Sequence, residues 1–317
     1  MFDSFSGDFP DYTEHLKKTF LKELQRVLTI RVYMKMHNTI ALLQARVHSS
    51  RLPGKVLMSL QGKPVIGIML ERLKRSKELD GIVVVTSTEP ANGAIEYVAQ
   101  QYEIPCFRGS EKDVLDRYYQ ASLSYGVNHI VRLTGDCPLV DPDIIDNVIK
   151  SYHQSNVDLA VATAFPDGLD VCVFSFNALE LAWKNAKLAS EREHVVPWIF
   201  KRTQLHGKNL YKSLNYGTEE ILPDVCIPIN ETSEYMFQAI NYSCPENLRD
   251  ERWTIDEPDD FIFLQELSKS LSISLVDASW RDILQTLNKY PEIGVINKHI
   301  IRDEGYKNSL TKDMVCL

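Results

Sequence analysis

The amino-acid sequence predicts an α/β fold, in which a doubly wound and mostly parallel sheet is covered by helices on both faces. Three observations lead to this prediction. Short apolar runs alternate with segments of helical periodicity between residues 39 and 155. The run 81–85 is rich in β-branched residues, as are strands that are buried on both faces of a parallel sheet. Polar clusters follow the apolar runs, and ligands of such sheets bind beyond the carboxyl ends of the strands.

The predicted elements follow in chain order. We expect strands over 39–43, 81–85, 104–107 and 129–133, and helices over 65–77, 95–102, 114–125 and 142–152. Ser110 and Asp113 form an N-cap pair for the third helix, and Asp141 caps the fourth, with Pro142 at its first position. Further strands are expected over 159–164 and 169–174, and further helices over 177–187 and from Phe261 to Leu287. Residues 203–250 carry no readable pattern.

The chain is expected to have three parts. Residues 1–37 form a helical extension, because Leu16, Phe20 and Leu24 recur at helical spacing. Residues 38–265 form the main domain, and residues 266–317 form a helical C-terminal tail. We assign no catalytic role to the extension.

Composition excludes several classes of protein. The net charge of −8, the pI near 5.6 and the lack of a long basic run argue against nucleic acid as a partner. No run approaches the ~18 apolar residues of a membrane span, and the N-terminus lacks a signal-peptide pattern. We therefore expect a cytoplasmic protein that does not bind membranes. The six cysteines show no C-x-x-C spacing, so they are expected to be reduced and mostly buried rather than zinc ligands or a redox pair.

The loop Gln44–Lys55 is the expected phosphate-binding segment. It contains three cations, Arg46, Arg51 and Lys55, together with hydroxyls that include Ser49, so it can surround a polyanion such as a triphosphate. It is not a Walker loop, because its only glycine directly precedes the lysine. The alternative is a solvated basic loop, which the negative net charge of the chain makes less attractive.

This loop resembles the signature A-R-x-x-S-x-R-L-P-G-K of the CTP-dependent cytidylyltransferases that make CMP-sugar acids, in the branch named for spore-coat polysaccharide biosynthesis. Five further blocks extend the resemblance over about residues 39–310: R-G-S-E-K-D-V-L-D-R-Y, R-L-T-G-D-C-P-L-V-D-P, F-P-D-G-L-D-V, S-E-R-E-H-V and R-W-T-I-D-E-P-D-D-F. The resemblance implies a Rossmann-like nucleotidyltransferase. In its reaction an acceptor oxygen attacks the α-phosphorus of CTP and expels pyrophosphate. A homodimer is the assembly we consider.

Several residues receive expected roles in CTP binding. Arg46 and the solvent-reachable Lys55 should stabilise charge on the α-phosphate and the departing pyrophosphate, since phosphoryl transfer depends on positioning and electrostatics. The resemblance implies that the backbone near Ala45 recognises the base. It also places two pairs close to the base and ribose, Thr86-Ser87 and Arg108-Gly109. Ser49, Arg51 and Thr134 complete the predicted nucleotide site. Asn92-Gly93 replaces an acidic pair found in many relatives.

Asp136 and Asp256 are the predicted ligands of a Mg²⁺ cofactor and, with Arg46 and Lys55, the predicted catalytic residues. Asp136 follows an apolar run and Gly135, where a carboxylate faces the ligand crevice. At Asp256 the resemblance implies the second magnesium-binding aspartate. Mg²⁺ is usually held by one or two carboxylates plus phosphates. The alternatives are a turn aspartate at 136 and a helix N-cap at 256.

The acceptor site is expected to involve Asp170, Arg192 and His194. Asp170 orients the acceptor, assists the metal or supports a turn. Ser190 and Glu193 fit a capping box, which leaves Arg192 and His194 for an anionic acceptor, although a lone histidine is also a common structural residue. The acceptor is a small acid, either a sugar acid such as a nonulosonic acid or a small phosphate or phosphonate.

Two rival functions use the same sequence differently. A nucleotide-sugar-dependent glycosyltransferase would take Asp141-Pro142-Asp143 as a D-x-D motif, but a helix start explains the first two residues better. A non-catalytic assembly protein is the third interpretation, which the polar loop residues disfavour.

Overall fold

The computed structural model describes residues 39–214, 236–302 and 304–315. The predicted N-terminal helix, part of the unreadable segment, Cys226 and Cys316 lie outside the described residues. The strands of the main sheet are β1 (Thr39–Gln44), β4 (Gly81–Ser87), β5 (Cys106–Gly109), β6 (His129–Thr134), β7 (Leu159–Thr163), β8 (Cys172–Ser175), β9 (Thr203–Leu205), β10 (Lys208–Asn209) and β11 (Phe237–Ser243).

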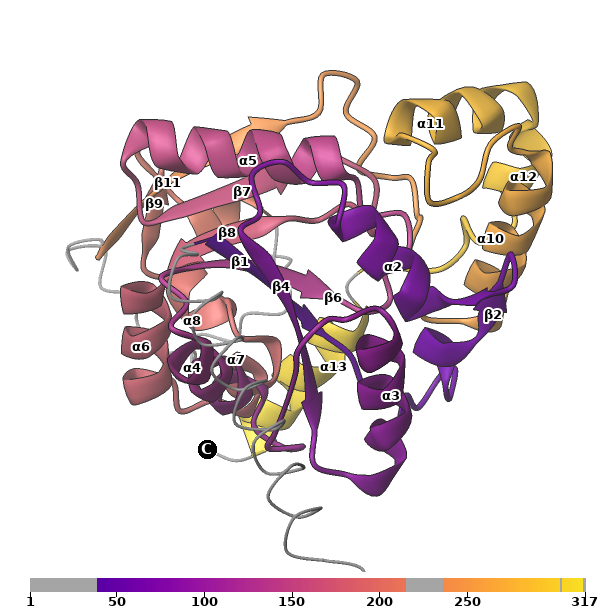
Figure 1. Cartoon of the computed structure of the whole chain (residues 1–317). Coiled ribbons are helices and arrows are strands. Elements are labelled where there is room, and N and C mark those ends of the chain that lie inside the picture. The colour runs from indigo at the N-terminus through magenta and orange to yellow at the C-terminus, as the bar shows by residue number, and fades with distance from the viewer. Residues whose placement is uncertain (1–38, 215–235, 303, 316–317) are drawn as a thin grey trace, which may run out of the picture.

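These strands form one sheet in the order β10-β9-β11-β7-β8-β6-β1-β4-β5 (Figure 1). β1 is parallel to β4 and β6, and β11 is parallel to β7 and β9. β8 runs antiparallel between β6 and β7, and β10 is antiparallel to β9. The predicted mostly parallel α/β fold is therefore confirmed.

The helices are α2 (Val65–Leu73), α3 (Gly93–Gln101), α4 (Val114–Tyr125), α5 (Pro142–Ser155), α6 (Phe176–Asn185), α7 (Ala189–His194), α8 (Pro197–Phe200), α9 (Leu210–Ser213), α10 (Pro258–Ser270), α11 (Trp280–Lys289), α12 (Pro291–Gly294) and α13 (Glu304–Val315). Short 3₁₀ turns η1 (Lys55–Leu57) and η2 (Pro90–Asn92) and the hairpin β2 (Ser59–Leu60) and β3 (Lys63–Pro64) complete the described chain. None of the described helices is both long and apolar enough to span a bilayer.

Helices cover both faces of the sheet (Figure 1). Alternate residues of β1 accordingly belong to two different hydrophobic cores. Ala41 and Leu43 belong to a core shared with α2, α5, α10 and α11. Ile40 and Leu42 belong to a second core shared with α4, α6, α8 and α13. Side chains of a strand alternate between faces, so burial of both sets explains why this strand is apolar throughout.

Two predicted helix starts are confirmed. The Asp113 carboxylate accepts a hydrogen bond from the Asp116 N–H, and Ser110 Oγ accepts one from the Asp113 N–H. Asp141 caps α5 with Pro142 at its first position. The predicted capping box at Ser190 is wrong, because Ser190 lies inside α7 and donates from its N–H and Oγ–H to the Asp313 carboxylate of α13.

Two other predicted elements have different bounds. The strand expected over 169–174 begins only at Cys172, because a turn precedes it in which the Leu169 N–H donates to Pro166 O. The single helix expected from Phe261 to Leu287 is two helices, α10 and α11. Between them the carbonyls of Leu275 and Ala278 accept hydrogen bonds from the fully buried Arg72 guanidinium, which anchors this stretch in a non-helical conformation.

The division of the chain at residue 265 stays a prediction. α10 and α11 contribute Phe263 and Ile283 to the first core, and α13 contributes Tyr306 and Leu310 to the second. The described cysteines, Cys106, Cys137, Cys172 and Cys244, are free thiols.

Candidate active site

The carboxyl ends of four neighbouring parallel strands bring the predicted nucleotide-binding residues to one edge of the sheet. Gln44 of β1 is paired with Thr134 of β6, and Ser87 of β4 is paired with Gly109 of β5. Ala45 follows directly after β1 and is buried. A Cβ at Gly135 would lie 2.9 Å from the Ala45 Cβ, so glycine allows the loops after β1 and β6 to touch.

The phosphate-loop candidate, Gln44–Lys55, has a defined turn. Gly54 has a φ of 74°, which favours glycine, and its N–H donates to Val47 O at 2.9 Å. The Ser49 hydroxyl accepts a long hydrogen bond of 3.4 Å from the Leu52 N–H. The loop therefore returns on itself before it delivers Lys55.

Asn92 holds this loop against β4. Its side-chain oxygen accepts from the Val47 N–H at 2.8 Å, and its amide nitrogen donates to Ser87 Oγ at 2.6 Å. The side chain is completely buried. In the sequence Asn92 is only a departure from the family pattern, and its position as a polar residue after a strand is the only signal of its structural role.

Lys55 is the centre of the site. Its Nζ donates to Asp136 Oδ2 at 2.8 Å, to Asp256 Oδ1 at 2.7 Å and to Ile255 O at 2.8 Å. Lys55 is only 8% exposed, so the expectation of a solvent-reachable lysine is wrong. Its aliphatic stem is covered by the fold, and only the carboxylates and a carbonyl make burial of the ammonium tolerable.

Electrostatics around Lys55 favour the charged forms. Burial alone would lower the pKa of Lys55, but the carboxylates of Asp136 and Asp256 hold it above its usual value. Burial alone would raise the pKa of Asp136, but the Lys55 ammonium and a hydrogen bond from Thr134 hold it well below its usual range. The ammonium and the Asp136 carboxylate therefore both stay ionised at neutral pH.

Arg252 fixes Asp256 in place, and sequence reasoning had given it no role. Its guanidinium donates to Asp167 at 2.8 Å, to both oxygens of Asp260 at 2.8 Å and to Asp256 at 3.5 Å. Burial would lower the pKa of Arg252, but these carboxylates hold it above the usual value. The only sequence signal was its place in the R-W-T-I-D block.

Backbone contacts align the same segment with the loop after β6. The Ile255 N–H donates to Asp136 O at 2.8 Å, and Thr254 Oγ1 donates to the same oxygen at 2.9 Å. Glu257, not Asp256, is the N-cap of α10, so the N-cap alternative for Asp256 is wrong. The Asp256 carboxylate instead contacts Lys55 and Arg51.

The three predicted arginines of the nucleotide site differ in their surroundings. Arg51 contacts Asp256 at 3.0 Å, Glu257 at 3.4 Å and Glu304 of α13 at 3.0 Å. The Arg46 side chain is 43% exposed, and its ion pairs with other described residues are long, with Glu111 at 3.8 Å and Glu193 at 3.9 Å. Arg108 donates to Ser87 O at 3.1 Å, to Glu89 O at 2.9 Å and to Glu96 at 3.0 Å.

The three predicted acceptor residues do not contact one another in the described structure. Asp170 accepts hydrogen bonds from Arg302, at 2.8 and 3.1 Å. Arg192 pairs with Asp113 at 2.6 Å and donates to carbonyls at the end of α6. His194 Nε2 lies 3.0 Å from Ser309 Oγ of α13, and burial lowers the pKa of His194 to about 4. Arg192 and His194 therefore connect helices.

The carboxylates at Lys55 fit a hard divalent cation. Oxygens of Asp136 and Asp256 both lie within 2.8 Å of the same ammonium nitrogen, so the fold already gathers them around one positive charge. The described residues contain no group of three or more His, Cys, Asp or Glu side chains placed to hold a metal. Two carboxylates supplemented by phosphate oxygens and water are the usual setting for Mg²⁺.

Comparison with known proteins gives a consistent result. Residues 40–254 match the family model described as cytidylyltransferase. An uncharacterized protein of Methanocaldococcus jannaschii is 37% identical over 270 residues, which cover 84% of this chain and 97% of that protein. The spore coat polysaccharide biosynthesis protein SpsF of Bacillus subtilis is 31% identical over 176 residues, 54% of this chain and 73% of that protein.

A more distant relative and a solved structure are both named as cytidylyltransferases. The 3-deoxy-manno-octulosonate cytidylyltransferase of Mesorhizobium japonicum is 33% identical over 127 residues, 39% of this chain and 51% of that protein. A cytidylyltransferase structure from Leptospira borgpetersenii is 30% identical and covers 84% of this chain and 100% of its own, with a TM-score of 0.68.

Proposed function

Because the chain belongs to the cytidylyltransferase family, we propose that it transfers a cytidylyl group from CTP to a small acidic acceptor and releases pyrophosphate. The observation that carries the proposal is the contact of Lys55 with Asp136 and Asp256 at the edge where β1 and β6 end. An acceptor oxygen forms a bond to the α-phosphorus, and the bond from that phosphorus to the bridging oxygen breaks. The electron pair leaves with pyrophosphate.

The cations of the loop provide the electrostatic part of this reaction. Lys55 and Arg51 lie beside the same Asp256 carboxylate, and Arg46 lies at the start of the loop with an exposed side chain. Positive groups that are fixed before the substrate arrives stabilise developing charge without reorganisation. Arg252 keeps Asp256 oriented while Asn92 holds the loop against β4.

Asp136 and Asp256 are the residues that would hold Mg²⁺. The cation would neutralise charge on the triphosphate and on the departing pyrophosphate. Lys55 would remain the fixed counter-charge of both aspartates, so the protein supplies two anions and one cation to a ligand that brings both a metal and phosphates.

A sugar acid is our preferred acceptor, for incorporation into a surface glycan. The Mesorhizobium japonicum relative is named for 3-deoxy-manno-octulosonate, and the Bacillus subtilis relative is named for spore coat polysaccharide biosynthesis. The glycosyltransferase alternative finds no support at Asp141, which is 1% exposed and accepts hydrogen bonds from backbone N–H groups of Asp143 and Trp280. A homodimer and a cytoplasmic location stay predictions.

Thermal denaturation with a nucleotide panel tests the nucleotide part. We expect CTP with Mg²⁺ to stabilise the chain by about 2.7 kcal/mol at one hundred times its Kd, because a ligand that binds only the native state shifts the folding equilibrium by mass action. UTP, ATP, GTP and UDP-sugars should stabilise it far less. Stabilisation by a UDP-sugar but not by CTP would overturn the proposal. Pyrophosphate release from CTP with 3-deoxy-manno-octulosonate then tests transfer.

A further inference from the structure

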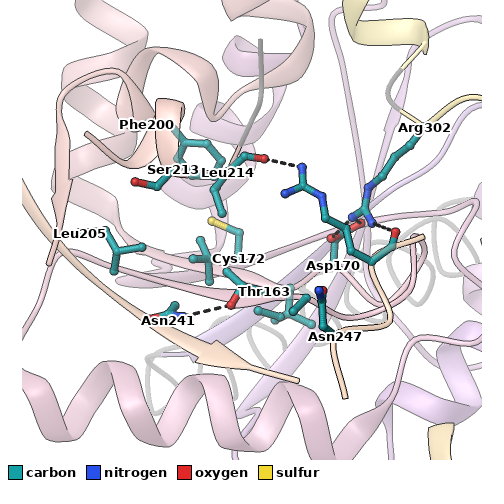
Figure 2. A pocket seen from close by; sticks show the side chains of 15 residues that line it. Thr163, Asp170, Cys172, Phe200, Leu205, Ser213, Leu214, Asn241, Asn247 and Arg302 are labelled. Carbon is teal, nitrogen blue, oxygen red and sulfur yellow. Dashed lines mark hydrogen bonds and ion pairs between the residues drawn. The ribbon is translucent and has the colours of Figure 1, made fainter. Parts of the chain in front are cut away.

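A cavity of about 300 Å³ is lined by residues of β7, β8, β9 and β11 and of the segments around them (Figure 2). β7 and β8 supply Val161 and Cys172 to its apolar wall, and Thr163 lies where β7 ends. Thr163 is fixed by the side-chain amide of Asn241 in β11, which donates to its Oγ1 at 3.0 Å. The strands that build the cavity are therefore part of the same sheet that carries the nucleotide site.

Sheet topology places this cavity beside the candidate reaction centre. β8 lies between β6 and β7, and Cys172 is paired with Arg132 of β6 and Val161 of β7. Because β8 is antiparallel, the residues just before it, including Asp170, lie at the edge where β6 and β7 end. Asp136 leaves β6 at that edge too. Asp167 begins this connection and contacts Arg252, which also contacts Asp256.

Charged side chains face the cavity from three segments of the chain. Arg302 donates to both Asp170 oxygens, at 2.8 and 3.1 Å, and to Arg249 O at 3.0 Å. Arg249 donates to Leu214 O at 2.7 Å, and a guanidinium carries five N–H donors in all. Two guanidinium groups and one carboxylate give the wall a positive balance (Figure 2). Arg302 lies beyond residues 40–254 that match the family model.

We propose that this cavity binds the acceptor, and that the acceptor is a single polyhydroxylated sugar that carries a carboxylate. Arg249 contacts the carboxylate, since guanidinium–carboxylate hydrogen bonds are strong and directional. Asp170 accepts hydrogen bonds from acceptor hydroxyls, and Arg302 positions Asp170. The volume is at the small end of the range for ligand sites, which suits one sugar unit rather than an oligosaccharide. This inference rests on the proposed cytidylyl transfer and deepens it.

Binding of defined probes to the full chain tests the pocket separately from turnover. The probes are 3-deoxy-manno-octulosonate and N-acetylneuraminate as acids and mannose as a neutral sugar, each measured by saturation-transfer NMR and calorimetry with and without CTP and Mg²⁺. The wild type should bind one of the acids and not mannose. Arg249→Ala should weaken acid binding about 10- to 100-fold, as expected for loss of hydrogen bonds to a charged group. Its Kd for CTP should change less than twofold.

Arg302 and Asp170 are tested by a split between kinetic constants. Arg302→Ala and Asp170→Asn should raise the KM for the acid about tenfold or more, with a smaller change in kcat and none in the Kd for CTP. Arg302→Lys should recover part of the loss and serves where Arg302→Ala fails to fold. Arg281→Ala is the matched control, because this arginine lies on α11 with a 63% exposed side chain and does not line the cavity.

The outcomes separate the two proposals. Equal acid binding by wild type and Arg249→Ala overturns the pocket, as does the absence of acid binding by the wild type under every condition. CTP binding that persists in either case leaves the proposed nucleotide site standing. Acid binding that depends on Arg249, in a protein that releases no pyrophosphate from CTP, refutes the proposed function and supports the pocket.

Discussion

Lys55 shows how the site depends on the balance of a few charges. An ammonium that is nearly buried between two carboxylates is tolerable only while both partners remain, because each unpaired charge would carry its full desolvation penalty. The side chains of Asp136 and Asp256 are still 25% and 23% exposed, so a cation that arrives with the triphosphate can reach them. The same geometry therefore stabilises the fold without nucleotide and would leave both carboxylates accessible to the proposed metal.

Removing either aspartate charge should abolish turnover and should also lower the melting temperature, because Lys55 then keeps only one carboxylate partner, but the chain should still fold. Asp136→Asn and Asp256→Asn keep the side-chain shape but lack the charge that a hard cation requires. The double variant should be hardly worse than either single variant, since residues that act as a unit are not additive. Pyrophosphate release measured against Mg²⁺ concentration checks this.

Asp143→Asn is the control for that experiment, because Asp143 is exposed on the first turn of α5. It should retain wild-type turnover. Wild-type dependence on Mg²⁺ in either Asp136→Asn or Asp256→Asn would show that the pair does not form the metal site.

Lys55→Ala should lower both the rate of turnover and the free energy of unfolding. Loss of one fixed electrostatic donor typically lowers the rate about 10²- to 10³-fold. The two carboxylates would also lose their shared partner, which should lower the free energy of unfolding by about 1 to 3 kcal/mol. Added Mg²⁺ should restore part of that loss, which thermal denaturation measures without any turnover. Lys63→Ala is the control. It removes the ion pair of a 43% exposed lysine with Glu71, so it should change neither the rate nor the stability by much. A normal rate in Lys55→Ala would remove this residue from the mechanism.

Sequence reasoning placed the predicted nucleotide-binding residues at one edge of the sheet because their motifs are local, and the structure brings them to that edge. Lys55 ends a recognisable loop, and Asp136 leaves a recognisable strand. The partners that fix them were not predictable, because Arg51 meets Glu304 and Asp170 meets Arg302 only in the folded chain. No sequence spacing identifies such pairs.

The connection before β8 approaches the segment before Asp256 closely at Gly168. Gly168 has a φ of 102°, and a Cβ there would lie 2.8 Å from the Trp253 carbonyl carbon and oxygen. Next to it the Trp253 N–H donates to Asp167 O at 2.7 Å. This approach aligns the segment that carries Asp256 with the connection before β8.

Gly168→Ala should destabilise the protein and impair the site. A non-glycine residue in such a conformation costs about 1 to 3 kcal/mol, and the clash with Trp253 adds to that. Turnover should also fall, because the segment leading to Asp256 must move. Gly93→Ala is the matched control, since its Cβ would meet nothing within 4 Å and the residue is helical. Equal melting temperatures for Gly168→Ala and the wild type would contradict this account.

The contact between α7 and α13 should be sensitive to acid, because it involves the buried His194. Burial lowers the pKa of His194 to about 4, with Arg132 and Arg46 acting in the same direction and Glu193 and Asp313 opposing. The unfolded chain, with a histidine pKa near 6.5, therefore binds more protons between these values. Stability from this group is complete above about pH 6.5 and is lost as the pH falls toward 4.

His194→Gln should remove that part of the pH dependence. The difference in unfolding free energy between wild type and variant should shrink by about 2 kcal/mol as the pH falls from 7 to 4, after allowance for partial exposure of the ring. Urea denaturation at several pH values measures it. Parallel pH profiles for the two proteins would show that His194 titrates normally in the folded state.

Periodicity predicted elements well where a helix or strand was regular. It failed where tertiary contacts decided the outcome. Ser190 has a good capping-box spacing, but Asp313 supplies its hydrogen-bond partner instead. The stretch between α10 and α11 has apolar residues at helical spacing, but its carbonyls are needed by buried Arg72. The antiparallel direction of β8 also has no local signal.

In the whole molecule, one half of the sheet carries the proposed nucleotide site and the other half carries the proposed acceptor cavity. β6, β1, β4 and β5 end at the nucleotide edge, and β11, β7 and β8 enclose the cavity. Asp136 leaves β6, which adjoins β8 at the boundary between them. α13 touches both halves through the residues at its start, with Glu304 on Arg51 and nearby Arg302 on Asp170. Arg302 and Glu304 thus contact residues of the proposed sites, although both lie beyond the family match.

This arrangement predicts opposite results for shortening the chain at its two ends. Removal of residues 1–35 should leave turnover unchanged, because β1 begins at Thr39 and the family match begins at residue 40. Removal of residues 302–317 should abolish it. That deletion uncovers a core to which Tyr306 and Leu310 contribute, at about 1.5 to 3 kcal/mol for each apolar side chain, and it takes away Arg302 and Glu304.

Melting temperature and pyrophosphate release, measured on both truncations, check this contrast. Arg302→Ala in the full chain separates the causes, since it removes the charge and keeps the apolar side chains of α13. If the short C-terminal deletion is merely unstable, Arg302→Ala should retain both stability and the KM for the acceptor. If Arg302 positions Asp170, this single change should raise that KM while the melting temperature stays near that of the wild type. A folded N-terminal truncation without turnover would show instead that residues 1–35 belong to the catalytic unit.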